Sequence, residues 1–327
     1  MHWILVILQS ARLSVLVNGK AVGFFSCSRG VCQGDPLSPL LFCLAEEVLS
    51  RALSMAATYG QLTPMSYCRG VAFPTHILYA DDVLIFCTGN KRNIHRLLNI
   101  FNKYSEVSDQ LINNAKSRFF TGAMSGSRVQ MISSLLGFTV GALPFTYLGC
   151  PIFRGKSKVS HFQVITDRIK TKLSTWKGTI LSIMGRVQLV KSIIHGMLVY
   201  SFHVYLWPRR LLRSLDTWIT NFIWSGDVHT RKVCTVSWKV LCRPWSQGGL
   251  GIKSTRLIND ASMLKLAWDL FSSNSQWAVL FKRRFFSHGQ PIRYFAQSSV
   301  WHGVKNHIST IIQNTLWIVG MGDRINM

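Results

Sequence analysis

The segment Ile77–Phe86, ILYADDVLIF, carries two adjacent carboxylates, Asp81 and Asp82, between two apolar runs. Each run reads as a strand that is apolar on both faces, which is typical of the central strands of a sheet. A tight turn at Ala80–Asp82 would place both acids at the tip of a hairpin. Burying an ionised carboxylate without a partner is costly, and a like charge beside it raises that cost. The pair therefore requires a compensating Lys or Arg, a proton or a metal ion.

Carboxylate oxygens are the ligands that Mg²⁺ prefers, and Mg²⁺ commonly binds through one or two of them together with substrate phosphates. A hairpin tip with two aspartates therefore predicts a metal platform for phosphoryl chemistry. The alternative is an exposed turn, in which Asp is favoured because its side chain bonds to nearby backbone.

The charge of the chain is strongly uneven along its length. The net charge is +24, with 37 Lys and Arg against 13 Asp and Glu. Residues 1–109 hold 9 basic and 7 acidic residues, whereas residues 110–327 hold 28 and 6. Such an excess of cations indicates a polyanionic partner, most simply nucleic acid. The alternative is a basic surface with no partner.

Periodicity and turn residues predict an α+β fold, with an antiparallel sheet and helices on one of its faces, followed by a helical region. Asn18-Gly19 is the favoured pair of a type I′ hairpin turn. Ser38 is expected to cap a helix, with Pro39 in its first turn. The expected apolar stripe of that helix is Leu41, Leu44, Val48, Ala52 and Met55. Hairpins are predicted at 14–27 and 77–87, helices at 90–107, 127–136, 185–205 and 209–224, a helical stripe through 162–176, and extended chain at 144–153.

The eight cysteines include no CxxC pair, so free thiols in a reducing compartment are expected. The start of the chain lacks the pattern of a secretory signal, which predicts an intracellular protein, in the nucleus or the cytoplasm. Ser192–Pro208 is apolar but short for a membrane span, so a buried helix is expected. A membrane-associated or structural protein anchored by this segment remains as an alternative of a different class.

Two segments resemble sequence boxes of reverse transcriptases. Tyr79-Ala80-Asp81-Asp82 resembles the YxDD box, and residues 29–42, RGVCQGDPLSPLLF, resemble a second box that precedes it. Residues 108–117, SDQLINNAKS, are similar to the SGQxxNxxKS segment of LINE-type, non-LTR retrotransposon enzymes, with Asp109 in place of the usual Gly. Residues 145–151 resemble their primer grip. The segments WKG at 176–178, GR at 185–186, LVKS at 189–192, NFIW at 221–224 and GGLG at 248–251 resemble plant members, rather than a group II intron maturase or telomerase.

The resemblance implies an RNA-directed DNA polymerase that transfers nucleotides onto a primer 3′ end with two Mg²⁺ ions. The partners would be an RNA template, a DNA primer and deoxynucleoside triphosphates, with no membrane; the oligomeric state is open. The implied organisation is a partial palm at 1–155, a basic helical thumb at 156–270 and a truncated C-terminal extension at 271–327. The implied roles are catalysis for Asp81, Asp82 and Lys116; metal binding for Asp81 and Asp82; template or nucleotide binding for Gln33, Gly34, Pro36, Tyr79 and Ala80; and primer binding for Tyr147, Leu148 and Gly149.

The resemblance departs from the family pattern at the first catalytic box. That box carries a further Asp upstream of the strand containing Val15–Asn18, and no Asp or Glu precedes Asp35 in this sequence. The third carboxylate is therefore missing from these residues, along with the fingers and any endonuclease domain. Because two-metal transfer depends on a preorganised set of ligands, weak or absent polymerisation is expected. The alternative reading is a catalytically inactive remnant that still binds nucleic acid.

Overall fold

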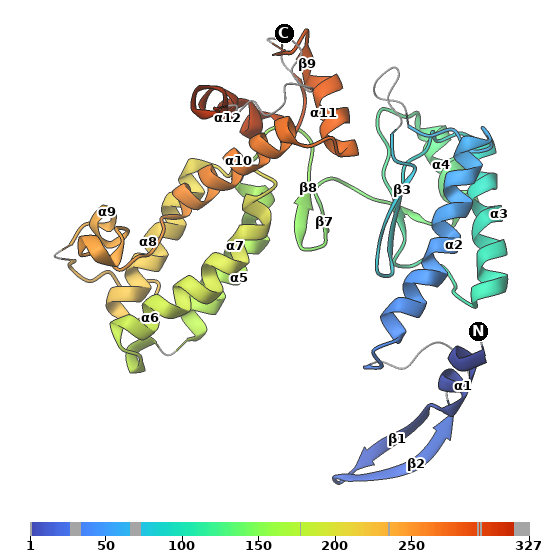
Figure 1. Ribbon diagram of the computed structural model, residues 1–327, viewed down its shortest axis with the longest axis horizontal. Coiled ribbons are helices and arrows are strands. Elements are labelled where there is room, and N and C mark those ends of the chain that lie inside the picture. The colour runs from blue at the N-terminus through green and yellow to red at the C-terminus, as the bar shows by residue number, and fades with distance from the viewer. Residues whose placement is uncertain are drawn as a thin grey trace. The chain divides into compact units, whose positions relative to one another are not determined.

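The computed structural model describes residues 2–26, 34–65, 73–176, 178–234, 236–292, 294 and 296–316. Contacts divide the chain into two compact units, Met1–Gly141 and Ala142–Met327 (Figure 1). The first combines helices with short strand pairs and the second is mainly helical, so the chain is a mixture of helix and strand of the expected α+β kind. Gln33 and Lys177 lie outside the described residues.

The first unit has two hairpins and a short parallel strand pair, joined by helices. Its elements are α1 (His2–Ser10), β1 (Arg12–Val17), β2 (Lys20–Ser26), α2 (Ser38–Thr58), β3 (His76–Tyr79), β4 (Asp82–Ile85), α3 (Lys91–Ser108), β5 (Arg118–Phe119), α4 (Gly126–Leu136) and β6 (Thr139–Val140). The hairpin of β1 and β2 turns at Asn18 and Gly19, whose φ values are 50° and 78°. The predicted type I′ turn is therefore confirmed, because that turn requires positive φ at both positions.

The core of the first unit forms where α2, α3 and β4 meet. Leu49, Leu53 and Leu97 are buried there, and Val83 and Ile85 of β4 pack against them. Helix α3 begins one residue after its predicted start, with Asn90 as the N-cap, whose side chain accepts a 2.8 Å hydrogen bond from the backbone N–H of Asn93. The hairpin of β3 and β4 is therefore held on a two-helix support.

The apolar stripe predicted for α2 is not the face that packs in the core of this unit. Leu44, Val48 and Met55 are 64%, 59% and 55% exposed, whereas the buried face carries Leu49 and Leu53. Both faces of this helix are apolar, so spacing alone did not identify the face that packs against α3. The helix also starts one residue earlier than predicted: Ser38 is its first residue and Leu37 is the N-cap, with no side-chain capping bond.

The second unit begins with one more hairpin and continues as a helical array. Its elements are β7 (Phe145–Tyr147), β8 (Cys150–Ile152), η1 (Val159–Phe162), α5 (Gln163–Thr175), η2 (Gly178–Ile180), α6 (Ile183–Leu189), the π-helical turn η3 (Val190–Ile194), α7 (His195–Phe202), α8 (Arg209–Ser225), α9 (Trp238–Leu241), η4 (Trp245–Gln247), α10 (Thr255–Ser272), α11 (Gln276–Phe285), β9 (Phe286–Ser287), β10 (Gln290–Pro291) and α12 (Trp301–Asn314).

Two apolar clusters hold the second unit together. The larger one joins α5 to α8 and includes the predicted stripe residues Phe162, Ile169 and Leu173. The smaller one joins α10, α11 and α12, where the rings of Phe285 and Trp301 stack with their centroids 4.8 Å apart. In the described ranges, no helix combines the length and the apolar character that a membrane span requires.

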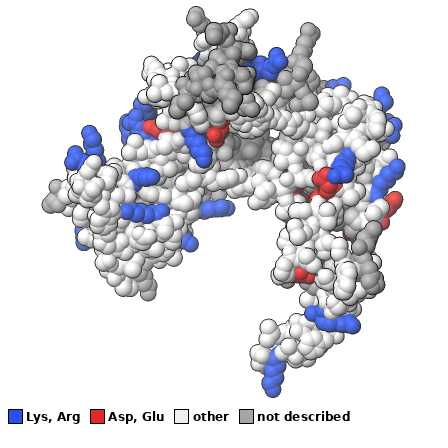
Figure 2. Space-filling view, viewed as in Figure 1, with Lys and Arg blue, Asp and Glu red and all other residues white. Residues whose placement is uncertain are grey.

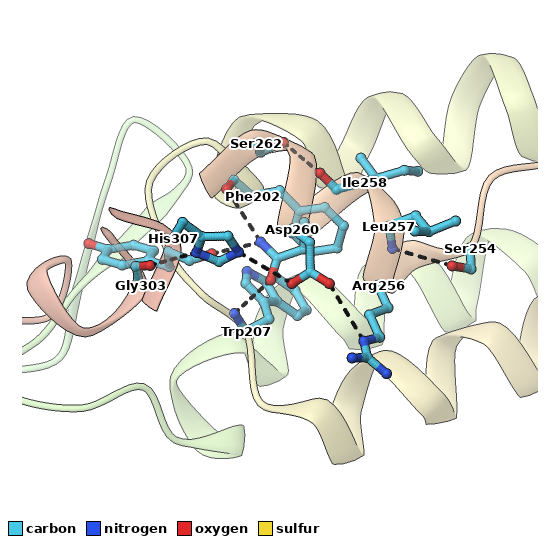
Figure 3. Close-up of polar contacts among 12 residues, drawn as sticks. Phe202, Trp207, Ser254, Arg256, Leu257, Ile258, Asp260, Ser262, Gly303 and His307 are labelled. Carbon is cyan, nitrogen blue, oxygen red and sulfur yellow. Dashed lines mark hydrogen bonds and ion pairs between the residues drawn. The ribbon is translucent and has the colours of Figure 1, made fainter. Parts of the chain in front are cut away.

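A buried asparagine connects α10 to the turn between α7 and α8. Asn259 accepts a 2.9 Å hydrogen bond from the backbone N–H of Trp207 and donates one of 2.8 Å to the carbonyl of Tyr205. One residue further along α10, Asp260 contacts Arg256 at 3.5 Å and His307 of α12 at 3.8 Å (Figure 3). These contacts fix the start of α10 relative to both neighbours.

Candidate functional site

The paired carboxylates lie where predicted, at the end of the hairpin formed by β3 and β4. The strands pair antiparallel, and Tyr79 stands directly opposite Asp82. Ala80 and Asp81 form the two-residue turn between them, and Ala80 has a φ of 48°. A non-glycine residue in this left-handed region is uncommon and costs roughly 1–2 kcal/mol. The turn is therefore maintained against a local backbone cost, as is frequent at functional sites.

One face of this hairpin is anchored on the helices, and the other is open. His76 Nε2 lies 2.9 Å from Ser50 Oγ of α2, on the face that also carries Val83. The opposite face carries Ile77 and Tyr79, which are 44% and 60% exposed. The expectation that these are central strands of a larger sheet is wrong for the described residues, where β3 and β4 pair only with each other.

Asp81 and Asp82 are both exposed. Neither forms an ion pair or a side-chain hydrogen bond with any residue that the structure describes. A Lys or Arg partner was one of three expected ways to compensate the two negative charges. No such partner is found in the described ranges. Two uncompensated carboxylates on a fixed turn fit the oxygen-ligand preference of Mg²⁺. Those ranges contain no cluster of three or more His, Cys, Asp or Glu able to hold a metal ion, so the pair would rely on further ligands, such as substrate phosphates.

The segment that precedes α2 contains the described part of the second box. Gly34 has a φ of 91°, a conformation that favours glycine. The Oδ1 atom of Asp35 accepts a 2.9 Å hydrogen bond from the backbone N–H of Leu37, and Pro36 lies between them. This local turn fixes the entry of the chain into α2.

Lys116 lies in the connection between α3 and β5 and is exposed. Its backbone N–H donates to Asn113, with Oδ1 at 3.2 Å, so the backbone of this loop is ordered while the ammonium group stays in solvent. At the start of the connection, Asp109 ends α3 with a φ of 57°. This conformation explains why glycine is usual there in the family and why Asp, which tolerates the left-handed region, can replace it.

The predicted primer-binding residues form the turn of the hairpin of β7 and β8. Leu148 and Gly149 have φ values of 48° and 78°, and Tyr147 pairs with Cys150. This hairpin belongs to the second unit, whereas Asp81 and Lys116 belong to the first. Within its unit, the hairpin is tied to the helical core by a 2.8 Å hydrogen bond from Tyr205 to the carbonyl of Pro151.

The structure brings together three of the later segments around one buried arginine, Arg186 of the GR segment, to which the sequence assigned no role. Arg186 is 9% exposed and donates to the carbonyls of Gly178 at 2.6 Å and Ile223 at 2.8 Å. Beside it, a Cβ on Gly178 would lie 2.4 Å from the carbonyl oxygen of Gly226. Packing thus explains why the WKG, GR and NFIW segments meet: the arginine and the glycines hold α6 against the end of α8.

The GGLG segment forms a turn. Gly248 caps η4 with a φ of 76°, and a Cβ on Gly249 would lie 2.0 Å from the carbonyl oxygen of Arg243. Next to this turn, the Lys191 ammonium of the LVKS segment lies 5.5 Å from the ring centroid of Trp245. Gly249 therefore serves close backbone packing, whereas Gly248 supplies the positive φ of the turn.

Among the charged side chains on the visible face of the helical unit, Lys and Arg are far more frequent than Asp and Glu (Figure 2). Arg168 and Lys172 line a depression of about 660 Å³ along α5, together with Asp167. Lys170 instead lies over the ring of Trp218, 5.7 Å from its centroid. Two of these α5 cations thus line the depression, and the third packs against an aromatic ring.

Comparison with known proteins identifies the class of the N-terminal part. Residues 1–152 match the family model described as "Reverse transcriptase (RNA-dependent DNA polymerase)". This part of the chain belongs to the reverse transcriptase family, and the whole chain resembles partial reverse transcriptases of non-LTR retrotransposons.

The relatives come from Arabidopsis thaliana and Xenopus laevis, and one of them is a transposon protein. One named as a candidate ribonuclease H protein of Arabidopsis thaliana is 27% identical over 184 residues, which is 54% of this chain and 29% of that protein. An uncharacterised mitochondrial protein of the same plant is 41% identical over 70 residues, 21% of this chain and 57% of its own length. An uncharacterised 149 kDa protein of transposon TX1 of Xenopus laevis is 25% identical over 278 residues, 83% of this chain and 20% of its own. The chain thus covers less than two-thirds of each of these three relatives.

Proposed function

We propose that the chain carries the palm and thumb of a LINE-type, plant retrotransposon reverse transcriptase, acting on an RNA template, a DNA primer and deoxynucleoside triphosphates. The observation that carries this proposal is the anchored turn with Asp81 and Asp82 uncompensated by any described cation, inside a segment of the reverse transcriptase family. The proposed boundaries are 1–155 for the palm, 156–270 for the thumb and 271–327 for the C-terminal extension.

The proposed roles follow from what each side chain offers. Asp81 and Asp82 would hold divalent cations, Mg²⁺ in the first instance, which when bound stabilise charge on the phosphates and activate the primer 3′ hydroxyl. Tyr79 and Ala80 would bound the primer end. Lys116, with its ammonium in solvent, would neutralise the triphosphate and donate a proton to the departing pyrophosphate.

The remaining predicted residues would position the nucleic acid. Gln33, Gly34 and Pro36 would bind template and incoming nucleotide, with Gly34 allowing close approach of the backbone. Tyr147, Leu148 and Gly149 would hold the primer strand through the hairpin turn that they form. The basic helical region would grip the duplex through its phosphates, because it holds most of the excess positive charge.

We also propose that these 327 residues have little polymerase activity on their own. The third carboxylate that the family uses is not found before Asp35 in the sequence, and the described ranges offer no third ligand beside the pair. We therefore expect weak or absent primer extension when these residues act alone. This observation also favours the second candidate function, binding of nucleic acid without catalysis.

Primer extension on an RNA template, with Mg²⁺ or Mn²⁺, tests both parts. Any residual synthesis should be lost in Asp81→Asn and retained in the control Glu106→Gln, which removes an exposed acid of α3. Synthesis that persists in Asp81→Asn would refute the role of the pair. Robust synthesis by the unaltered chain would refute the expected loss of activity and leave the polymerase assignment standing. A chain that binds no template–primer at all would contradict both candidate functions.

A further inference from the structure

A basic cavity of about 320 Å³ lies among α8, α9 and α10, and none of the residues given a role above lines it. Four cations contribute to its walls: Arg209 and Arg213 from α8, Lys239 from α9 and Arg256 from α10. Asp216 is the one carboxylate among its lining residues. The cavity is therefore strongly positive by count of charges.

The carboxylate of Asp216 is already engaged in holding the fold. Its Oδ1 accepts a 2.9 Å hydrogen bond from the backbone N–H of Thr255, and its Oδ2 accepts one of 3.1 Å from Trp238 Nε1. Burial raises the pKa of this carboxyl group, against the lowering effect of those hydrogen bonds. Asp216 thus fixes Trp238 and the start of α10 and does not pair with a cation of the cavity.

Three of the four cations have no partner within the described ranges. Arg256 contacts Asp260 at 3.5 Å (Figure 3). The side chains of Arg209, Arg213 and Lys239 form no ion pair or hydrogen bond with any described residue. Their positive charges are therefore free for a ligand, and their removal should leave the fold intact.

The placement of these cations is unfavourable for the isolated fold. Arg209 and Arg213 are four residues apart at the start of α8, so two like charges share one face of the helix. Arg256 lies in the first turn of α10. Cations near helix N-termini oppose the helix dipole, which favours negative charge there. A bound anion would remove both penalties at once.

We infer that this cavity binds a phosphate of a nucleic-acid backbone, held by Arg209, Arg213 and Lys239. Two guanidinium groups suit this ligand, because their planar donors match phosphate oxygens in pairs. The identity of the anion rests on the proposed function, in which the basic helical region binds template–primer duplex. The cavity itself is defined by geometry and charge alone.

The test compares two variants of the full chain with equal loss of charge. Arg213→Gln/Lys239→Gln removes two cavity cations, whereas the control Lys265→Gln/Arg283→Gln removes two exposed cations of the same unit that do not line the cavity. Fluorescence anisotropy with a labelled RNA–DNA hybrid gives affinity across a range of salt concentrations. The cavity variant should bind about tenfold or more weakly, with a salt slope lower by roughly 1, because the one phosphate contact that is lost contributes about 0.9.

The possible outcomes separate this inference from the proposed function. If the cavity variant binds like the control variant while the unaltered chain binds the hybrid, the cavity assignment is overturned and the proposed function is not. If the unaltered chain binds no hybrid, the proposed function is refuted, and so is the assignment of a nucleic-acid phosphate as the ligand of the cavity.

A second measurement does not depend on the folding of a variant. Cys242 lines the same cavity, so bound hybrid should slow its alkylation in the unaltered chain, as followed by mass spectrometry. Cys43, an exposed thiol of the first unit, serves as the internal reference. Equal alkylation of Cys242 with and without saturating hybrid would overturn the inference.

Discussion

Asp82 stands directly opposite Tyr79 in the register of β3 and β4, with Asp81 in the turn between them. This pairing puts one carboxylate at the end of a strand, on the open face with an exposed aromatic ring, and the other on the turn itself. The helices behind the opposite face, joined through His76 and Ser50, keep the position of the turn fixed. The site therefore depends on a supported hairpin, and its predictions concern the turn, its support and its charge.

The first prediction concerns the turn residue Ala80, which has a φ of 48°. Ala80→Gly should raise the free energy of unfolding by about 0.5–1 kcal/mol, since glycine adopts this conformation without the Cβ penalty. Ala80→Val should lower it, because a β-branched residue is strongly disfavoured at positive φ. Urea unfolding followed by fluorescence measures both. As a control, Ala45→Gly within α2 should cost about 1 kcal/mol; a loss of stability in Ala80→Gly would contradict the strained turn.

The second prediction concerns the close approach of Gly178 to Gly226. A Cβ at Gly178 would meet backbone atoms at 2.4 Å and beyond, so Gly178→Ala should destabilise the second unit by about 1–3 kcal/mol. Gly196 in α7 is the matched control, because a Cβ there has nothing within 4 Å. Gly196→Ala should stabilise by up to about 1 kcal/mol through helix propensity. Equal effects of the two substitutions in urea unfolding would contradict the packing role.

The third prediction concerns pH. Burial, reinforced by Lys253 and Lys191, lowers the pKa of His195 from 6.5 to about 4, and its Nε2 is buried without a hydrogen-bond partner. The folded protein therefore holds this imidazole neutral, while the unfolded chain takes up a proton near pH 6.5. Stability from this group is fully present above that value and is lost as the pH falls towards 4. The loss by pH 4 is about 3 kcal/mol, since one pKa unit corresponds to about 1.4 kcal/mol.

Unfolding free energies measured from pH 7.5 down to pH 4 check this loss. The variant His195→Gln carries no titrating group at this position, so its stability should fall less over the same range. Parallel curves for the two proteins would show that another group controls the acid dependence.

Local chemistry in the sequence predicted several elements well. Asn18-Gly19 predicted its turn, because the conformation is set by these residues themselves, and the ranges predicted for α3 and α4 are correct to within one residue at each end. The paired acids predicted a hairpin tip for the same reason. The packing face of α2 was not predictable, because Leu occurs on both of its sides and only the position of α3 selects between them.

Roles that depend on contacts between residues far apart in the chain could not be predicted from the sequence either. Arg186 is a basic residue in a basic chain, and only the structure shows that it is buried among the carbonyls of Gly178 and Ile223. The cavity of α8, α9 and α10 gathers cations from positions 209 to 256. No sequence spacing predicts that these cations come together, because their proximity arises from the packing of three helices.

Mn²⁺ binding, followed by electron paramagnetic resonance with a deoxynucleoside triphosphate present, tests the central claim most directly. If the turn holds divalent cations, Asp81→Asn should lose one class of bound Mn²⁺ that the unaltered chain and Glu106→Gln both retain. Identical Mn²⁺ binding curves for all three proteins would contradict the account.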